Sequence, residues 1–448
     1  MKLNQIKKTM RETVSFLRSR IKYLLLICIA ILLGVWSCSD DTGDEESIYD
    51  PTKPAVLNSF YPDSGKYEEQ VILSGSNFGN KAENINVYFN NAKAAVIGTD
   101  GKQIYVQVPR LPGDTCLISV VIGEDSLCYE KKFLYHKSVT VTTIAGNGNG
   151  HDYVDGDLTS SILKPKYICV DKEGNIFIIV WNDDRTVYSI CRIDEEDNEL
   201  ITIKKDIVGN VPCADPTTGI ITIPTEATQG SFLTLDPDEM WAPRIREMKY
   251  QDLSKLPLYG WKHCMVVNPD DGYIYAQYYT GELVKINAKS YSTEVINTNM
   301  PGDCYGMTFS PLHPNLLYLS FYNGQYANCI YTINVTAPDS TFQRIAGATS
   351  GGHRDGPLDV AEFRQPSQMF CDNDGNIYIA DFGNSCIRRI TPDGMVETVL
   401  GMPGTAGWKD GTKDEALFNN PTGIGIGIDG SVYVADFGNS RVRKLSIN

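Results

Sequence analysis

Aromatic residues recur in this sequence at the ends of predicted β-strands. Five of them follow the second strand of successive strand-rich segments, namely Trp181, Tyr279, Tyr322, Phe382 and Phe437. Three more ring residues each precede the glycine of an Asp-Gly pair by three positions, in predicted connecting loops, namely Tyr153, His353 and Trp408. Rings exposed at a protein surface stack on the apolar faces of pyranose sugars. The pattern therefore predicts ligand-binding residues for a carbohydrate: Trp181, Tyr279, Tyr322, Tyr153, His353 and Trp408.

Packing between neighbouring sheets is an alternative explanation of the strand-end rings. It applies above all to Phe382 and Phe437, and it stays open for the other three. Trp241 and Trp261 are additional candidates whose facing the sequence does not fix.

A calcium site is a second kind of chemistry that one segment suggests. Asp372-Asn-Asp374-Gly375 has the residue types of half a calcium loop, but no ligating Glu follows at the required distance. Similar turns recur as DKEGN, IDGS and PDDGY. Tight hairpin turns in which glycine supplies a positive φ explain all of these segments, and we expect no metal at them.

Catalytic motifs are absent from the sequence. The five histidines, at positions 136, 151, 263, 313 and 353, share no metal-ligand spacing, and neither a G-x-S-x-G elbow nor a P-loop occurs. Carboxylates are abundant, but the sequence alone does not identify a facing pair. We therefore predict no catalytic residue, no metal and no cofactor.

The predicted strands that position these rings belong to a sequence repeat. The segment at 377–390, IYIADFGNSCIRRI, returns at 432–445 as VYVADFGNSRVRKL. Upstream of each copy, Asp355 precedes Asp381 by 26 residues and Asp410 precedes Asp436 by 26, so the register holds across the unit. Short strands that repeat at this spacing are typical of a β-propeller.

The repeat resembles NHL-repeat propellers, whose blades carry a DG…P…DGN-hydrophobic-AD-x-GN-x-R pattern. Three degenerate units between the clear copies bring the expected number of blades to six between 138 and 448. The segment Val139 to Gly146, VTVTTIAG, resembles the fourth strand of the later units, so we expect it to complete the last blade and close the ring. Asp381 with Arg388 and Asp436 with Arg443 are expected to be ion pairs that stabilise their blades.

The segment 54–137 reads as a small β-sandwich of short strands and turns. It resembles an IPT/TIG immunoglobulin-like domain in its Pro62-x-Ser64-Gly65, Gly75-Ser-Asn77-Phe78-Gly79, Val108-Pro109 and Phe133-Leu-Tyr135 motifs. Such domains act mostly as spacers. The fold class is therefore expected to be all-β, a sandwich followed by a six-bladed propeller.

The N-terminal residues predict export. Residues 1–37 hold a basic stretch and then the apolar run LLLICIAILLGVW, which is too short to span a bilayer comfortably and suits a cleaved signal peptide. The following VWSC resembles a bacterial lipobox, in which Cys38 is lipidated. The acidic segment 38–53 is expected to be a flexible tether, and it resembles the export signal of surface lipoproteins in glycan-foraging Gram-negative bacteria.

The net charge and the spacing of the cysteines limit the kinds of partner and metal that we expect the protein to bind. Residues 1–37 carry seven Lys or Arg and one Glu, a net +6, so the mature chain carries −15 − 6 = −21, which disfavours nucleic acids and anionic lipids. No Cys pair has zinc-site spacing. Cys116 and Cys128 flank a predicted hairpin in positions that suggest a disulfide.

The resemblances together imply a non-catalytic lipoprotein of the outer membrane, exposed on the cell surface and attached to the membrane only by its lipid. It would bind a glycan through the propeller face, with a TonB-dependent transporter and its lipoprotein partner as expected partners. Two alternatives stay open: a lactonase- or lyase-like propeller enzyme with a metal at the channel mouth, and a protein-interaction scaffold.

Overall fold

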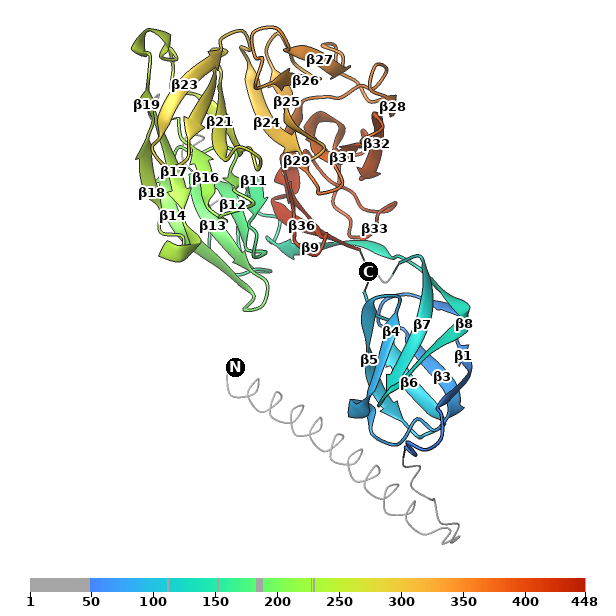
Figure 1. The fold of residues 1–448 in the computed structure, drawn as a ribbon. Coiled ribbons are helices and arrows are strands. Elements are labelled where there is room, and N and C mark those ends of the chain that lie inside the picture. The colour runs from blue at the N-terminus through green and yellow to red at the C-terminus, as the bar shows by residue number, and fades with distance from the viewer. Residues whose placement is uncertain are drawn as a thin grey trace, which may run out of the picture. The chain divides into compact units, whose positions relative to one another are not determined.

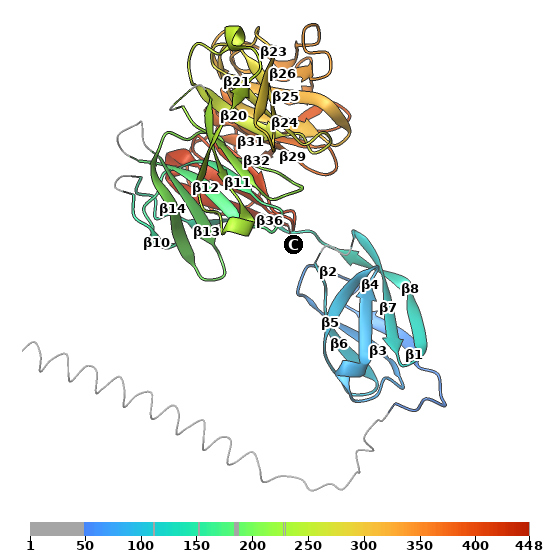
Figure 2. The same cartoon turned by 60° about the vertical axis from the view of Figure 1, so that its left-hand side comes forward.

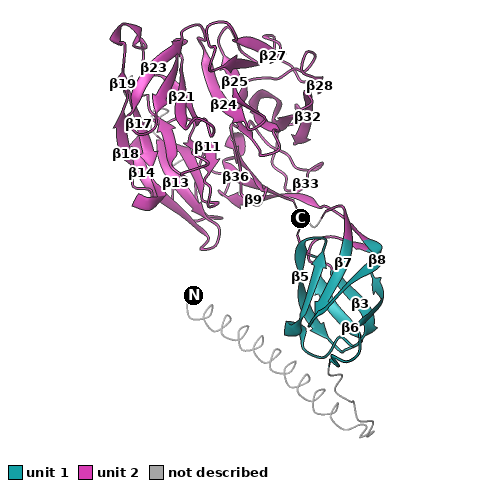
Figure 3. Cartoon of the chain, viewed as in Figure 1, with its two compact units in different colours: residues 1–63, 70–108, 117–132 teal, residues 64–69, 109–116, 133–448 magenta. Residues whose placement is uncertain are grey.

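The computed structural model describes residues 49–110, 113–150, 153–182, 188–226, 228 and 230–447. The predicted signal peptide, Cys38, most of the tether and His151 lie outside these residues. The described chain consists of β-strands and five short 3₁₀ helices (Figure 1), and none of its helices is long and apolar enough to span a membrane. It forms two compact units, which Figure 3 distinguishes: one contains 49–63, 70–108 and 117–132, and the other contains 64–69, 109–116 and 133–447.

The first eight strands form the predicted sandwich, with one 3₁₀ helix, η1 (Ala82–Asn84), between its third and fourth strands. Their spatial order is β1-β3-β6-β5-β4-β7-β8-β2. β5 pairs with β4 at its start and with β6 from Ala95 onward, so it passes from one layer to the other. The strands are β1 (Val56–Tyr61), β2 (Ser64–Gly65), β3 (Gln70–Ser76), β4 (Ile85–Phe89), β5 (Ala92–Thr99), β6 (Gln103–Gln107), β7 (Thr115–Ile122) and β8 (Asp125–Tyr135).

The suggested disulfide between Cys116 and Cys128 is wrong, because both are free thiols. Alternate residues of a strand point to opposite faces. Cys116 lies on the buried face of β7, whereas Cys128 lies on the exposed face of β8. The two sulfur atoms therefore point away from each other across the hairpin.

Six sheets follow one another in the rest of the described chain, and together they make up most of the second unit (Figures 1 and 2). We call each sheet with its connections a blade. The strands of blades 1 to 3 are β10 (Gly156–Asp157), β11 (Pro165–Val170), β12 (Ile176–Trp181), β13 (Tyr188–Asp194) and β14 (Glu199–Ile207), then β15 (Cys213–Ala214), β16 (Ile221–Pro224), β17 (Ser231–Leu235) and β18 (Arg244–Glu247), then β19 (Lys249–Tyr250), β20 (Lys262–Val267), β21 (Tyr273–Tyr278), β22 (Leu283–Asn287) and β23 (Ser292–Asn297).

Blades 4 to 6 repeat this plan, and the last also takes in the strand before blade 1. Their strands are β24 (Asp303–Ser310), β25 (His313–Asn323), β26 (Cys329–Asn334) and β27 (Gln343–Gly347), then β28 (Gly356–Pro357), β29 (Pro366–Cys371), β30 (Ile377–Asp381), β31 (Cys386–Ile390) and β32 (Met395–Leu400), then β33 (Gly411–Thr412), β9 (Val139–Ala145), β34 (Gly423–Ile426), β35 (Val432–Asp436) and β36 (Arg441–Ile447). The remaining 3₁₀ helices are η2 (Pro237–Glu239), η3 (Leu253–Lys255), η4 (Phe382–Asn384) and η5 (Phe437–Asn439).

The innermost strands of the six blades form a closed ring. β11 contacts β15, and contacts continue through β20, β24, β29 and β34 back to β11. The ring closes through the first strand of the propeller, as predicted, because β9 pairs antiparallel with β36 from Val139↔Ile447 to Ala145↔Val442. This pairing gives the C-terminal strand a partner on both sides and leaves it no open edge.

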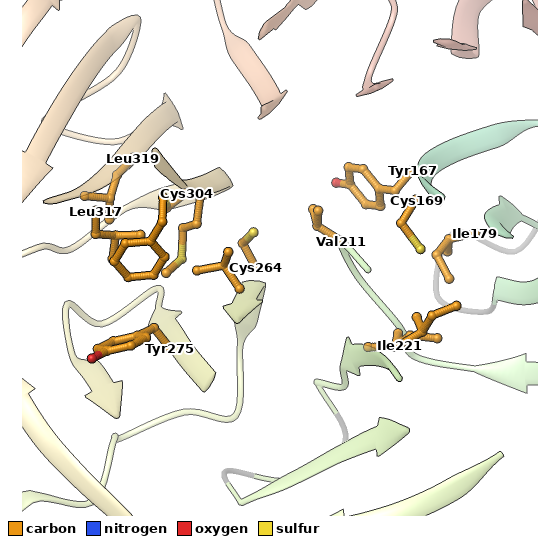
Figure 4. Packing of buried hydrophobic residues seen from close by; sticks show 14 of the residues in the cluster. Tyr167, Cys169, Ile179, Val211, Ile221, Cys264, Tyr275, Cys304, Leu317 and Leu319 are labelled. Atoms are coloured by element: carbon orange, nitrogen blue, oxygen red, sulfur yellow. The ribbon is translucent and has the colours of Figure 1, made fainter. Parts of the chain in front are cut away.

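The hydrophobic core lies between neighbouring blades. One buried cluster runs through blades 1 to 4, where inward-facing residues of each sheet meet those of the next. Figure 4 shows part of this cluster and labels Tyr167, Cys169, Ile179, Val211, Ile221, Cys264, Tyr275, Cys304, Leu317 and Leu319. A single blade cannot bury both of its faces, so the repeat is stable only as a ring.

The turn prediction is confirmed at Asp372. Its carboxylate accepts hydrogen bonds from the backbone N–H groups of Asp374 and Asn376 and from the Asn376 side chain, and Gly375 has a φ of 86°. The carboxylate oxygens are thus occupied by the turn itself. Asp171 binds Glu173 and Asn175 in the same way in blade 1.

Candidate carbohydrate-binding face of the propeller

One end of the propeller gathers most of the predicted rings. In antiparallel blades, the innermost strand begins at the same end at which the second strand stops. We call this end the loop face, and we define it by the starts of β11, β20, β24, β29 and β34 and the ends of β12, β21, β25, β30 and β35. Loops on such a scaffold are where binding residues concentrate.

The strand-end rings make contacts between neighbouring blades. Trp181 of blade 1 stacks on Phe437 of blade 6, with ring centroids 5.5 Å apart and planes 24° apart. Tyr322 of blade 4 meets Phe382 of blade 5 edge to face at 5.3 Å. All four side chains are only partly buried. They therefore pack between blades, as the alternative explanation held, and also keep part of each ring open to solvent.

Further rings extend the Tyr322–Phe382 pair into one continuous series. Tyr305 contacts Tyr322 at 5.5 Å and stacks on His263 at 4.6 Å. From His263 the series continues outward through Tyr279, then Trp261, then Tyr259, with centroid separations of 6.1, 5.5 and 5.3 Å. We call this series the aromatic track: Tyr259, Trp261, Tyr279, His263, Tyr305, Tyr322 and Phe382.

The outer end of the aromatic track is exposed. The exposed fractions are 49% for Tyr259, 46% for Trp261 and 38% for Tyr279, while Tyr305 is only partly buried and His263 is buried. The track thus runs from solvent toward the innermost strands. Its outer members offer ring surface that no part of the described chain covers.

The three ring residues predicted in the connecting loops lie away from the aromatic track. Tyr153, His353 and Trp408 each hydrogen-bond a threonine on the outermost full-length strand of a blade, on β14, β32 and β9 respectively. Burial raises the pKa of the Tyr153 hydroxyl, which also contacts the Cys191 thiol. Trp408 is 52% exposed and stacks on the Arg441 guanidinium at 3.8 Å. Among the described residues, no ring contact joins these three to the aromatic track.

Lysines are held over rings at the start of β11. The Lys164 ammonium lies 4.7 Å from the ring centres of both Trp181 and Phe437. Lys166 donates a hydrogen bond to the Tyr188 hydroxyl at 3.0 Å and lies over the Tyr188 ring. Cation–π contacts of this kind fix Lys164 beside two strand-end rings and Lys166 beside Tyr188.

Titratable side chains from four blades meet beside His263, in the middle of the aromatic track. The two nitrogens of His263 face different carboxylates: Nε2 lies 3.6 Å from Glu226 and Nδ1 lies 3.4 Å from Asp303. Asn210 donates a hydrogen bond to Glu226 at 2.7 Å. We call this set, with Lys166, the central polar cluster: Lys166, Asn210, Glu226, His263 and Asp303.

Burial controls the electrostatics of this cluster. It raises the pKa of Glu226 and of Asp303, and the nearby Lys166 charge partly offsets the shift in both. Burial, helped by the positive charge of Lys166, lowers the pKa of His263 to about 3. The imidazole is therefore neutral at physiological pH, and its single N–H can donate a hydrogen bond to only one of its two carboxylate neighbours.

Two buried polar atoms of the central polar cluster have no hydrogen-bond partner in the described chain. They are Nδ1 of His263 and Oδ1 of Asn210, in residues that are 5% and 3% exposed. Buried polar groups are nearly always paired. His263 and Asn210 lie beside the partly exposed carboxylates of Glu226 and Asp303.

No metal-binding group is present among the described residues, where no set of three or more His, Cys, Asp or Glu side chains gathers as ligands. Glu226 and Asp303 approach opposite nitrogens of His263, so the three do not converge on one point. The carboxylates at the hairpin turns are occupied by their own backbone.

Sequence reasoning missed the central polar cluster. Glu226 follows the second strand of blade 2, where the other blades carry an aromatic ring, but that blade is too degenerate to align. His263 and Asp303 lie near the starts of the innermost strands β20 and β24. A comparison of strand starts rather than strand ends is the signal that would have found them.

Comparisons with known proteins agree with both parts of the fold. Residues 55–135 match the IPT/TIG domain model, and residues 418–445 match the NHL repeat model. The chain is 34% identical over 97 residues to Protein SUPPRESSOR OF QUENCHING 1, chloroplastic, of Arabidopsis thaliana, and 34% identical over 83 residues to NHL repeat-containing protein 2 of Bos taurus. These matches cover 22% and 18% of this chain but only 9% and 11% of the relatives, so the chain spans about a tenth of their length.

Solved structures resemble nearly the whole chain. A Bacteroides thetaiotaomicron protein of unknown function has a TM-score of 0.66 at 26% identity, and an auxiliary nutrient binding protein from Bacteroides ovatus has a TM-score of 0.64 at 20% identity. An auxiliary nutrient binding protein from Bacteroides thetaiotaomicron has a TM-score of 0.59 at 22% identity. Each match covers 90% of this chain and 99% or more of the other. The protein has an IPT/TIG domain followed by a six-bladed propeller with an NHL repeat.

Proposed function

We propose that this protein is a non-catalytic binding protein for a carbohydrate, and that the loop face of its propeller is the binding surface. The aromatic track carries the proposal. Its exposed members present ring faces to solvent, and its inner members lead to a set of hydrogen-bonding groups. Flat rings with a few polar groups beside them suit a sugar, which has an apolar face and a hydroxyl edge.

The N-terminal residues and the similar solved structures support a proposal for the cellular role. A lipobox-like VWSC and an acidic tether favour a lipid-anchored protein at the outer membrane, displayed outward. Two proteins of the same fold are auxiliary nutrient binding proteins of Bacteroides. We therefore propose that the protein captures a glycan at the cell surface and supports its uptake by a TonB-dependent transporter with a lipoprotein partner.

Affinity electrophoresis tests the binding function. Purified protein would be run in native gels that contain xyloglucan, arabinoxylan, pectic galactan, mannan, inulin or chondroitin sulfate. We expect at least one polysaccharide to retard the protein, and we expect Trp261→Ala and Tyr279→Ala each to weaken binding about tenfold, because hot-spot aromatic residues carry much of the binding energy.

Trp408→Ala is the matched control, because Trp408 is about as exposed as Trp261 but lies outside the aromatic track. We expect this variant to bind like the wild type. Loss of binding in Trp408→Ala with none in Trp261→Ala would move the ligand to the outer loops. Failure of every polysaccharide in the panel to retard the protein would contradict the proposal.

Glycan cleavage is the second candidate function, and the pair Glu226 and Asp303 favours it. Two carboxyl groups with raised pKa values flank the same imidazole, and paired carboxylates are the usual machinery of glycoside hydrolysis. Chromatography of the retarding polysaccharide after incubation with the protein separates the two functions. Shortened products would favour cleavage, and an unchanged polymer would favour capture.

A further inference from the structure

We propose that the central polar cluster is a subsite that holds two neighbouring hydroxyl groups of one neutral sugar residue. This inference rests on the proposed function and names the chemistry that the loop face recognises. It assigns a binding role to Glu226, Asp303 and Asn210, which no sequence motif identified.

The hydrogen-bonding capacity of the cluster fits a pair of hydroxyls. Each hydroxyl donates one hydrogen bond and accepts up to two. The carboxylates of Glu226 and Asp303 and the buried, unpaired Oδ1 of Asn210 are acceptors, while the Lys166 ammonium is a donor. A diol that donates to the carboxylates and accepts from the ammonium would satisfy groups that the protein leaves incompletely paired.

The charge of the cluster favours a neutral ligand. The two carboxylates are nearly balanced by the charge of Lys166, which is close to both, and by a partial charge on Lys262, which is close to Glu226 and whose pKa burial lowers to about 7. His263 is neutral. An ionic ligand would upset this balance in a partly buried site, where an uncompensated charge is costly.

The aromatic track supplies the stacking surface for the same sugar residue. His263 belongs to both the track and the cluster, and its ring stacks on Tyr305 at 4.6 Å. Tyr305 itself lies 5.9 Å from the Lys166 ammonium. A pyranose ring stacked on Tyr279, the exposed neighbour of His263 in the track, would therefore bring its hydroxyl edge toward Glu226 and Asp303.

A ligand-and-protein mutant cycle tests the subsite. The probes are the methyl glycosides of glucose, galactose, mannose and xylose. Each is used at up to about 100 mM, enough for a weakly binding ligand, to release the protein from the retarding polysaccharide. The best competitor is compared with its deoxy analogues, each lacking one hydroxyl. In the wild type we expect removal of either of two adjacent hydroxyls to raise the competing concentration about tenfold.

The variants are Glu226→Gln and Asp303→Asn, with Glu397→Gln as control because Glu397 lies on an outer strand and pairs with Arg389. We expect the first two to weaken binding about tenfold and to lose discrimination against the matching deoxy sugar, while the control keeps both. Asn210→Ala repeats the test should a carboxylate variant not fold, as judged by its melting curve. Its predicted effect is the same weakened, less selective binding.

Several results would overturn the subsite. These are wild-type affinity in both carboxylate variants, unchanged discrimination in them, competition by none of the methyl glycosides, or stronger competition by methyl glucuronide than by methyl glucoside. A polysaccharide that binds while the carboxylate variants behave as wild type removes the subsite but leaves the proposed function standing. Binding to no polysaccharide removes the proposed function itself.

Discussion

At the scale of single residues, the repeated motif gives each clear blade one buried ion pair. Arg388 Nη1 lies 3.0 Å from Asp381 in blade 5, and both side chains are fully buried. Arg388 also donates to the Arg354 and Glu362 carbonyl oxygens and to Asp355. Burial raises the pKa of Asp381 to about 6 despite the arginine. Each such pair is therefore costly to form and costly to break.

Arg388→Met tests this argument. We expect the substitution to lower the free energy of unfolding by about 3–5 kcal/mol, because it leaves the Asp381 carboxylate buried without its cation. Urea unfolding followed by circular dichroism measures the change. Arg389→Met is the matched control, since Arg389 pairs with the half-exposed Glu397 and such surface pairs contribute about 1 kcal/mol or less. Equal losses in the two variants would contradict the special role of the buried pair.

The sequence predicted the buried ion pairs but not the central polar cluster. Asp381 with Arg388 and Asp436 with Arg443 repeat at a fixed spacing within one blade, so their pairing followed from the motif, and it is confirmed. The central polar cluster draws its members from the edges of four different blades. No local spacing records that meeting, because it depends on how the ring closes.

At the scale of elements, β9 is the strand on which closure depends. It lies between β36 and β33, so its backbone hydrogen bonds join the first strand of the propeller to the last blade. Val141 of β9 is 1% exposed and packs in the cluster of blades 5 and 6. Loss of β9 would open two edges at once, one on each neighbour.

Thr142→Pro tests closure by β9. Proline removes a backbone donor and is not tolerated in the middle of a sheet, so we expect a loss of about 3 kcal/mol or more and faster proteolysis of the C-terminal strand. Lys413→Pro is the control, because Lys413 is exposed at the second position of the turn from Thr412 to Glu415, where proline is favoured. Thermal unfolding and limited trypsin digestion measure both variants. A stable Thr142→Pro variant would contradict the closure argument.

The strands and blades were easier to predict than the positions of the side chains that they carry. Alternation, turn residues and the repeat gave the all-β class, the sandwich and the six blades, all of which the structure bears out. The loop residues Tyr153, His353 and Trp408 were expected beside the strand-end rings. They lie on the outermost full-length strands instead, because β10, β28 and β33 pair there and carry their loops along the outside of each blade.

At the scale of the whole molecule, the net charge bears on the proposed lipid anchor and on the proposed glycan ligand. The mature chain would carry −15 − 6 = −21, a charge that keeps a protein soluble and repels anionic surfaces. Such a protein would stay at a membrane only through an anchor. A neutral glycan is the kind of polymer that it could approach without long-range repulsion.

Cys38→Ala tests the anchor. With Cys38 in place, we expect the protein in the outer-membrane fraction of a Bacteroides host and digestion by proteinase K added to intact cells. A protein held by lipid needs the acyl chains for stable attachment, so the variant should be missing from the outer-membrane fraction. Because it would then stay inside the cell envelope, the added protease should not digest it. Cys128→Ala, which removes an exposed thiol in the sandwich, is the control and should behave as the wild type. Retention of Cys38→Ala at the outer membrane would mean that another part of the molecule holds it there.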